Sequence, residues 1–239
     1  MPYYERDGAQ IYFEEAGEGE TLLLIAPGGM RSAISFWSGT PWNPIDQLSS
    51  DYRVVAMDQR NAGASTAPVS GDDGWHTYTQ DQLGLMDYLG VDKFHVAGMC
   101  IGGPYSLGLI EAAPERVLSA TLFQTIGRDN NADAFYAMFD DWADKLKPER
   151  DTEEQSWQQF RENMYGGDRV LFNVDEDFVR ACQTPLLVLM GDDLYHPQSS
   201  SRMIAETAPN VTFIEDWKDG QAREQAMQTF ADFLAENGA

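Results

Sequence analysis

Short, nearly continuous apolar runs alternate along this chain with segments whose apolar residues recur at helical spacing. The runs are residues 21–26, 53–57, 94–98, 117–124 and 185–190. Such runs are typical of strands that are buried on both faces of a parallel sheet. The segment 78–89 has helical spacing and ends at Gly90, a residue that favours a helix terminus. The alternation predicts an α/β fold, with a mostly parallel, doubly wound sheet that helices cover on both faces.

The first strands differ from this pattern. Residues 3–6 and 11–15 flank Asp7-Gly8, a pair that favours the type I′ turn of an antiparallel hairpin. The sheet should therefore begin with a hairpin. The remaining elements that we expect are a short helix over 45–49, a helix over 199–207, a strand over 211–214 and a closing helix over 220–236.

Residues 129–177 are different in character, because they are acidic and aromatic, show helical periodicity and contain no good strand. We interpret them as a small helical lid inserted in a single domain over 1–239. The lid aromatics should mostly cover the core, and one or two of them, with Phe36 and Trp37, should line an apolar pocket. These aromatics are Phe135, Phe139, Trp142, Trp157 and Phe160.

The net charge of −23 is the one extreme feature of the composition. It argues against nucleic acid and anionic membranes as partners, and it is typical of a solvated surface; steering of a cationic substrate is the alternative. No apolar run approaches membrane-spanning length, and the first residues lack a secretory signal pattern, which favours the cytoplasm. The scattered histidines show no metal-ligand spacing, so we expect neither a metal nor another cofactor. The oligomeric state is left open.

The stretch around Cys100 is the strongest chemical signal. It reads FHVAGMCIGG, a strand followed by a tight turn and a helix, with Gly98 and Gly102 two residues on either side of Cys100. Small residues are needed there because side chains would clash across such a turn. The turn exposes Cys100 at a helix N-terminus, which lowers a thiol pKa and suits a nucleophile. The alternative is an inert, buried cysteine.

Other polar clusters follow the same strand ends. They lie at residues 27–30, 58–65, 124–127, 191–197 and 215–219. Because ligands bind outside the carboxyl ends of parallel strands, we expect one site at this edge of the sheet.

Four of these motifs together resemble those of the α/β-hydrolase family. They are APGGM, DQRNAGAS, GMCIGG and GDDLYHP, and the resemblance covers essentially the whole chain. It implies a cofactor-free hydrolase in which Cys100 replaces the usual serine, as in the dienelactone-hydrolase branch. It also implies an oxyanion hole formed by the backbone N–H groups of Ile101 and of Gly29, or of Met30 instead.

The chain departs from the family at the catalytic base, which is normally a histidine after the last strand. Residues 215–219 contain no histidine. His196, in the loop after the 185–190 strand, is therefore our candidate base, with a surface histidine beside a turn proline as the alternative. Lys218 occupies roughly the missing position and is a second candidate. A thiol ionises more readily than a hydroxyl, so a displaced base remains compatible with Cys100.

Asp193 is the residue that the resemblance implies as the acid orienting the base. Asp192 and Asp129 are the alternatives. We expect the two remaining histidines, His76 and His95, to be structural, His76 just before a helix and His95 within a core strand.

The loop after the 53–57 strand should brace the site. We expect Asp58, Arg60 and Ser65 to form an arginine–carboxylate and turn network, and Gly63 to adopt a backbone conformation closed to other residues.

These features predict a hydrolase that acts on a small ester, lactone or thioester, with a small-molecule acyl substrate as its partner. Cys100 would attack, His196 would transfer the proton and Asp193 would orient the imidazole. One alternative is a lyase or C–C-bond hydrolase that uses the same pocket. The other is a catalytically silent, ligand-binding homologue, which the missing terminal histidine would favour.

Overall fold

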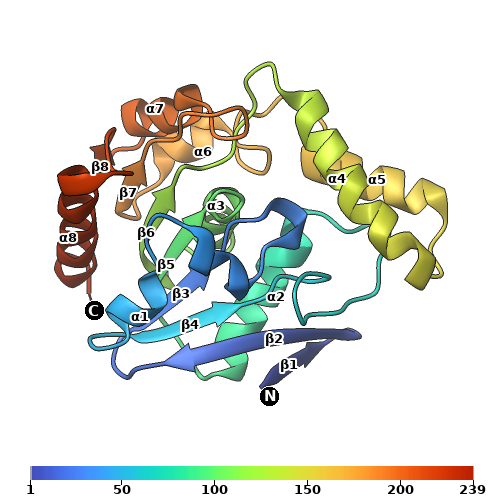
Figure 1. The fold of residues 1–239 in the computed structure, drawn as a ribbon, viewed down its shortest axis with the longest axis horizontal. Helices are drawn as coiled ribbons and strands as arrows, with labels where there is room; N and C mark the ends of the chain where they lie inside the picture. Colours follow the sequence, from blue (N-terminus) through green and yellow to red (C-terminus); the bar gives the residue numbers. More distant parts are fainter. Residues whose placement is uncertain (1, 239) are drawn as a thin grey trace.

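The computed structural model describes residues 2–238 and contains one eight-stranded sheet (Figure 1). The strand order is β1-β2-β4-β3-β5-β6-β7-β8; β1 and β2 are antiparallel to their neighbours, and the others are parallel. The strands are β1 (Tyr3–Arg6), β2 (Ala9–Ala16), β3 (Thr21–Ile25), β4 (Arg53–Met57), β5 (Phe94–Met99), β6 (Val117–Phe123), β7 (Leu186–Leu189) and β8 (Val211–Ile214).

Helices lie on both faces of the sheet. They are α1 (Pro44–Leu48), α2 (Trp75–Tyr88), α3 (Gly102–Ala112), α4 (Ala132–Leu146), α5 (Glu154–Tyr165), α6 (Glu176–Ala181), α7 (Gln198–Thr207) and α8 (Gly220–Glu236), with 3-10 turns η1 (Gly29–Arg31), η2 (Ile34–Gly39) and η3 (Lys147–Glu149). The predicted fold class, a mostly parallel sheet covered by helices, is therefore confirmed.

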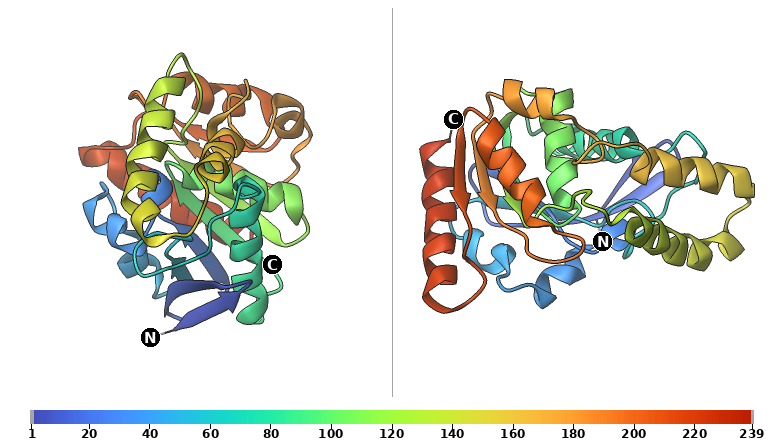
Figure 2. Two further views of the ribbon diagram at one scale, coloured as in Figure 1. Left: turned by 90° about the vertical axis from the view of Figure 1, so that its right-hand side faces the viewer. Right: turned by 90° about the horizontal axis from the view of Figure 1, so that it is seen from above.

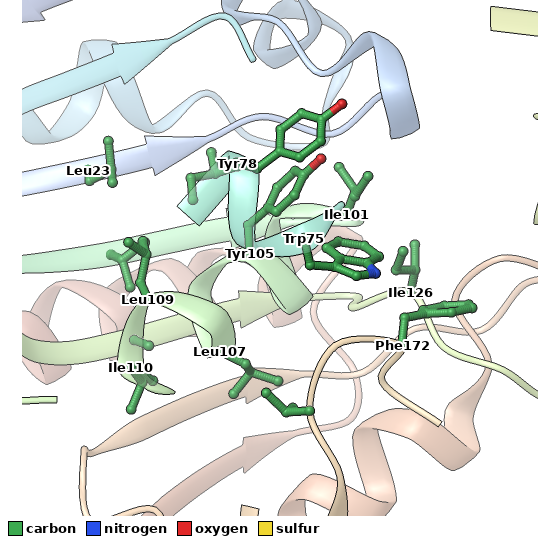
Figure 3. Close-up of a cluster of buried hydrophobic side chains, with 14 of the residues drawn as sticks. Leu23, Trp75, Tyr78, Ile101, Tyr105, Leu107, Leu109, Ile110, Ile126 and Phe172 are labelled. Atoms are coloured by element: carbon green, nitrogen blue, oxygen red, sulfur yellow. The ribbon is translucent and has the colours of Figure 1, made fainter. Parts of the chain in front are cut away.

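Alternate residues of the strands pack into two separate hydrophobic cores, one on each face of the sheet. In β3, Leu23 and Ile25 pack against α2 and α3, whereas Leu22 and Leu24 pack on the face covered by α1 and α8. This alternation follows from the two-residue period of a strand, and it explains why the buried strands are apolar at most positions on both faces. Figure 3 shows part of the first core, where Trp75, Tyr78 and Tyr105 meet the strands.

Local signals account for most element boundaries. Asp7 and Gly8 have φ values of 48° and 79°, as a type I′ turn requires. The structure differs from expectation at α2, which begins at Trp75 rather than at residue 78. The first turn is closed there because the Gly74 N–H donates to Thr77 Oγ1 at 3.1 Å, a capping contact that the apolar spacing does not reveal.

The segment between β6 and β7 carries α4, η3, α5 and α6, and no strand occurs among its residues. Figure 2 shows α4 and α5 as an adjacent pair that projects from the body of the molecule. The aromatic side chains expected to cover the core there are at most 3% exposed; they are Phe135, Phe139, Trp142, Trp157 and Phe160. That this segment acts as a lid stays a prediction.

Phe36 and Trp37 do not behave alike. Phe36 is 42% exposed and lines a cavity together with Trp142, whereas Trp37 is buried in the core beneath α1 and α8. Neighbouring positions of the 3-10 turn η2 point to different sides, which the sequence alone did not separate. Across residues 2–238, none of the helices has the length and hydropathy needed to span a bilayer.

Candidate active site

Cys100 lies at the tip of the turn between β5 and α3, with a φ of 62°. This left-handed conformation is strained for a residue with a side chain. Its flanking glycines are required by close backbone contacts. A Cβ on Gly98 would lie 2.1 Å from the Gly102 oxygen, and a Cβ on Gly102 would lie 2.7 Å from the Ile25 oxygen. The sequence therefore specifies this turn through its two glycines.

Backbone amides surround the Cys100 thiol. Hydrogen-bond contributions from the backbone N–H groups of Gly28 and Ile101 lower the pKa of the Cys100 thiol, so both groups favour its thiolate form. Burial alone would raise the pKa of Cys100, but the interaction with His196 and these N–H groups lower it below its ordinary value. The thiol is thus placed where negative charge is stabilised.

His196 reaches this thiol from the loop after β7. Its Nδ1 lies 2.8 Å from both carboxylate oxygens of Asp193. Nε2 is therefore the nitrogen left to face Cys100; it is buried and forms no hydrogen bond of ordinary geometry within residues 2–238. The interaction between the thiol and the imidazole shifts the pKa of each group, first through a hydrogen-bond contribution and second through charge.

Burial alone would lower the pKa of His196, but Cys100 and then Asp193 raise it to about 9. For Asp193, burial is opposed by His196 and by backbone N–H groups, and the pKa of its carboxyl is lowered. The directions of these shifts favour a thiolate–imidazolium pair flanked by a carboxylate at neutral pH.

The loop that carries Asp193 and His196 is closed by two backbone hydrogen bonds. The N–H of His196 donates to the Asp193 carbonyl oxygen at 3.2 Å, and the reverse bond is 3.3 Å long. Gly191 allows this, because a Cβ there would lie 2.5 Å from the Cβ of His196. Spacing of three residues thus lets one short loop supply both side chains.

The loop after β3 lies beside the thiol. The N–H of Ile101 lowers the pKa of Cys100, and so does the N–H of Gly28 in this loop. Gly29 follows Gly28 in η1 with a φ of 58°. A Cβ on Gly29 would lie 2.3 Å from Met138 Sδ of α4, so α4 packs directly on this loop. That Ile101, with Gly29 or Met30, forms an oxyanion hole stays a prediction.

The alternative acids are engaged elsewhere. Asp192 forms an ion pair with Lys218, and both side chains are partly exposed. Asp129 accepts a hydrogen bond from Ser199 Oγ at 2.7 Å. The structure thus brings Asp193, and neither of the alternatives, against His196.

The other candidate bases do not reach the thiol. Lys218 lies near the Trp217 ring, 5.8 Å from its centroid, and is paired with Asp192. Trp217 itself is buried and donates from Nε1 to the Met190 carbonyl oxygen at 2.9 Å. His76 is exposed in the first turn of α2, and His95 is buried within β5.

The predicted bracing network is present with different partners. Asp58 accepts the N–H groups of Ile34 and Ala64, each at 2.7 Å. Ser65 Oγ donates to the Asp58 carbonyl oxygen at 2.8 Å. Gly63 has a φ of 54°, as expected.

Arg60 does not pair with Asp58. Its guanidinium binds both carboxylate oxygens of Asp81, at 2.7 and 3.0 Å, and Asp73 at 3.1 Å. These partners come from the following loop and helix, which the spacing within the motif could not identify.

Among residues 2–238, no group of three or more His, Cys, Asp or Glu side chains is arranged to hold a metal ion. In this described part of the chain, the edge of the sheet brings together a thiol, an imidazole and a carboxylate, but no set of metal ligands.

Comparison with known proteins agrees with this architecture. The family model described as "alpha/beta hydrolase fold" matches residues 21–175. A putative carbamate hydrolase RutD of Azorhizobium caulinodans is 34% identical over 51% of this chain and 43% of its own length. A 2-hydroxy-6-oxo-6-phenylhexa-2,4-dienoate hydrolase of Comamonas testosteroni is 30% identical over 45% of this chain.

The matched segment spans less than half the length of both relatives, 43% of the first and 37% of the second. Among solved structures, the enol-lactonase of Burkholderia xenovorans superimposes with a TM-score of 0.71 at 20% identity, covering 98% of this chain and 100% of that one. That likeness concerns the fold. The family model covers well over half of the chain, and the chain belongs to the α/β-hydrolase fold family.

Proposed function

We propose that this protein hydrolyses a small ester, lactone or thioester through an acyl-enzyme on Cys100. The observation that carries the proposal is the arrangement of Cys100, His196 and Asp193, with two backbone N–H groups at the sulfur. The coarser assignment, a hydrolase of this family, is supported by the family match and by the named activities of the relatives.

The reaction follows from the charges. The Cys100 thiolate attacks the acyl carbon, and the carbonyl oxygen takes the negative charge of the tetrahedral intermediate. N–H groups of Ile101 and of the Gly28-Gly29 turn would stabilise this oxyanion. The imidazolium of His196 gives its proton to the leaving oxygen or sulfur, and the C–O or C–S bond breaks, leaving a thioester on Cys100.

The second half of the reaction uses the same groups. Neutral His196 takes a proton from water, and the hydroxide attacks the thioester carbon. The Cys100 thiolate then leaves, and His196 retains the proton, which restores the starting pair. Asp193 holds the ring so that Nε2 faces the sulfur throughout. Since the nucleophile must stay reduced, the prediction of a reducing compartment is kept.

Acyl trapping tests the proposal. The protein is mixed with 4-nitrophenyl butyrate and quenched in acid, and the peptide containing Cys100 is examined by mass spectrometry. A butyryl group on Cys100 that disappears in Cys100→Ala supports the proposal. Turnover without any acyl-cysteine would overturn it.

A C–C-bond hydrolase is the second candidate, and the relative from Comamonas testosteroni favours it. Such an enzyme would use the acid–base groups without an acyl-enzyme. Cleavage of a vinylogous 1,5-diketone with no acyl group on Cys100 would support this candidate over the first.

A further inference from the structure

Three tyrosines near the nucleophile have no part in the chemistry described above. Tyr78 of α2, Tyr105 of α3 and Tyr165 at the end of α5 are each at most 1% exposed. They come from three separate helices, and the Trp75 ring joins two of them, with its centroid 5.2 Å from that of Tyr105 and 6.0 Å from that of Tyr165. Tyr165 lies close enough to Cys100 for that side chain to contribute, after burial and Tyr78, to its raised pKa.

Their hydroxyl groups have few hydrogen-bond partners among the described residues. Within residues 2–238, the hydroxyls of Tyr78 and Tyr105 have no hydrogen-bond partner of ordinary geometry. That of Tyr165 meets only Met30 Sδ, at 3.5 Å, and a thioether is a weak acceptor. Even a bond between Tyr78 and Tyr105 would leave one of the two O–H groups without an acceptor. A buried hydroxyl without a partner is unfavourable, so such groups call for an explanation.

The hydroxyls share a direction. The rings of Tyr78 and Tyr105 stack with centroids 4.9 Å apart and planes at 28°. Figure 3 shows both oxygens on the same side, beside Ile101, which directly follows Cys100. Two O–H donors therefore point the same way, toward the residue that follows Cys100 in the chain.

The local charge restricts what these donors can bind. The Arg60 guanidinium lies over the Tyr78 ring, 5.9 Å from its centroid. Its charge is already matched by Asp81 and Asp73, so the three side chains together carry one net negative charge. A carboxylate would be repelled here, whereas a neutral carbonyl oxygen would only accept hydrogen bonds.

We propose that Tyr78, Tyr105 and Tyr165 form a subsite that binds a neutral oxygen, such as a ketone, on the acyl half of the substrate. The subsite rests on the proposed acyl transfer at Cys100 and narrows its substrate class from alkyl esters to oxo-acyl esters. A site that supplies hydrogen bonds to an oxygen discriminates strongly against an analogue without it.

Matched aryl esters test the proposal. The 4-nitrophenyl esters of 4-oxopentanoate and 5-oxohexanoate are compared with those of 4-methylpentanoate and 5-methylhexanoate, which replace C=O by CH–CH₃, and with the anionic hemisuccinate. Each kcat/KM is divided by the rate of alkaline hydrolysis of that ester. For one oxo ester, we expect a preference over its methyl counterpart of about tenfold or more, and over the hemisuccinate as well.

Variants that each remove one hydroxyl test which tyrosines cause the preference for the oxo ester. Tyr78→Phe and Tyr105→Phe should each reduce the ratio toward unity, while Tyr88→Phe, an exposed tyrosine on the same helix as Tyr78, keeps it. The Phe variants should unfold at or above the wild-type temperature because the hydroxyls lack partners in the folded chain. No preference in the wild type, a preference that survives both variants, or a clear loss of stability would overturn the subsite.

A separate measurement keeps the subsite distinct from the catalytic proposal. Calorimetry on Cys100→Ala compares 4-oxopentanamide with 4-methylpentanamide, neither of which needs to react. Tighter binding of the oxo amide that is lost in the added Tyr105→Phe variant supports the subsite even if no ester is turned over. Equal binding of the two amides would overturn it.

Discussion

Two histidines in this protein each lie between a carboxylate and a side chain with a nucleophilic atom. One lies near the amino end of a parallel strand and the other beyond the carboxyl end of another. His196 contacts Asp193 at 2.8 Å and faces Cys100. His95 contacts Ser119 Oγ at 2.7 Å and Glu20 at 3.1 Å. By residue type alone, the second set is the more familiar catalytic combination.

Their surroundings differ. His95 and Ser119 are fully buried within strands, and burial lowers the pKa of His95 despite Glu20. Cys100 instead lies at a strained turn before a helix N-terminus, and the pKa of His196 is raised to about 9. The residue types therefore do not define a reactive site; the turn, the N–H donors and the accessible edge of the sheet do.

The largest difference is expected when the two nucleophilic atoms are removed. Cys100→Ala should lower kcat/KM for 4-nitrophenyl butyrate on the order of 10³-fold or more, since the group that attacks is lost. Ser119→Ala should leave it unchanged. Steady-state kinetics measure both, and a large loss in Ser119→Ala alone would reverse the assignment.

Substitution of one histidine should affect mainly activity, and substitution of the other mainly stability. His196→Gln should lower kcat/KM by about 10²–10⁴-fold, as expected when a general acid–base group is removed. His95→Gln should mainly lower the free energy of unfolding, by about 1–3 kcal/mol, because buried hydrogen bonds are lost. Steady-state kinetics and urea unfolding of the two variants distinguish these effects. If both variants lost kcat/KM and free energy of unfolding to the same extent, the two histidines would not differ in role.

The protonation of His95 should make the free energy of unfolding depend on pH. Its pKa is lowered in the folded state from 6.5, so below about pH 6.5 the unfolded chain binds a proton that the folded chain does not. The free energy of unfolding should therefore fall as the pH drops below this value. The slope should flatten in His95→Gln, and an unchanged slope would show that other groups cause it.

The smallest effect is expected at the position where the family usually has its base. Lys218→Met removes a side chain that pairs with Asp192 on the surface, so kcat/KM should stay close to that of the wild type. A loss comparable to that of His196→Gln would make Lys218 the base.

Most of the fold could be predicted from the sequence, because the buried parallel strands are mostly apolar and glycines mark tight turns. The position of Cys100 followed from Gly98 and Gly102, which backbone contacts require. The proximity of Asp193 and His196 also followed, since they lie three positions apart in one loop.

Features that depend on packing between distant segments could not be predicted. The partners of Arg60 come from another loop and helix, and the contact of Met138 with Gly29 joins residues on α4 and η1. Tyr105 of α3 and Tyr78 of α2 are 27 positions apart in the chain, and only the folded structure stacks their rings. Periodicity identifies the buried face of a helix but not the groups that meet there.

The pH dependence of Cys100 alkylation tests the central claim most directly. Iodoacetamide labelling of the Cys100 peptide would be followed by mass spectrometry from pH 5 to 10 in the wild type, in His196→Ala and in the exposed control His76→Ala. We expect the wild type and His76→Ala to react with a midpoint below the ordinary thiol pKa of about 8.5. The midpoint should rise by about one unit or more in His196→Ala, because burial then acts without the opposing imidazolium. An ordinary thiol midpoint in the wild type that does not move in His196→Ala would contradict the pairing of Cys100 with His196.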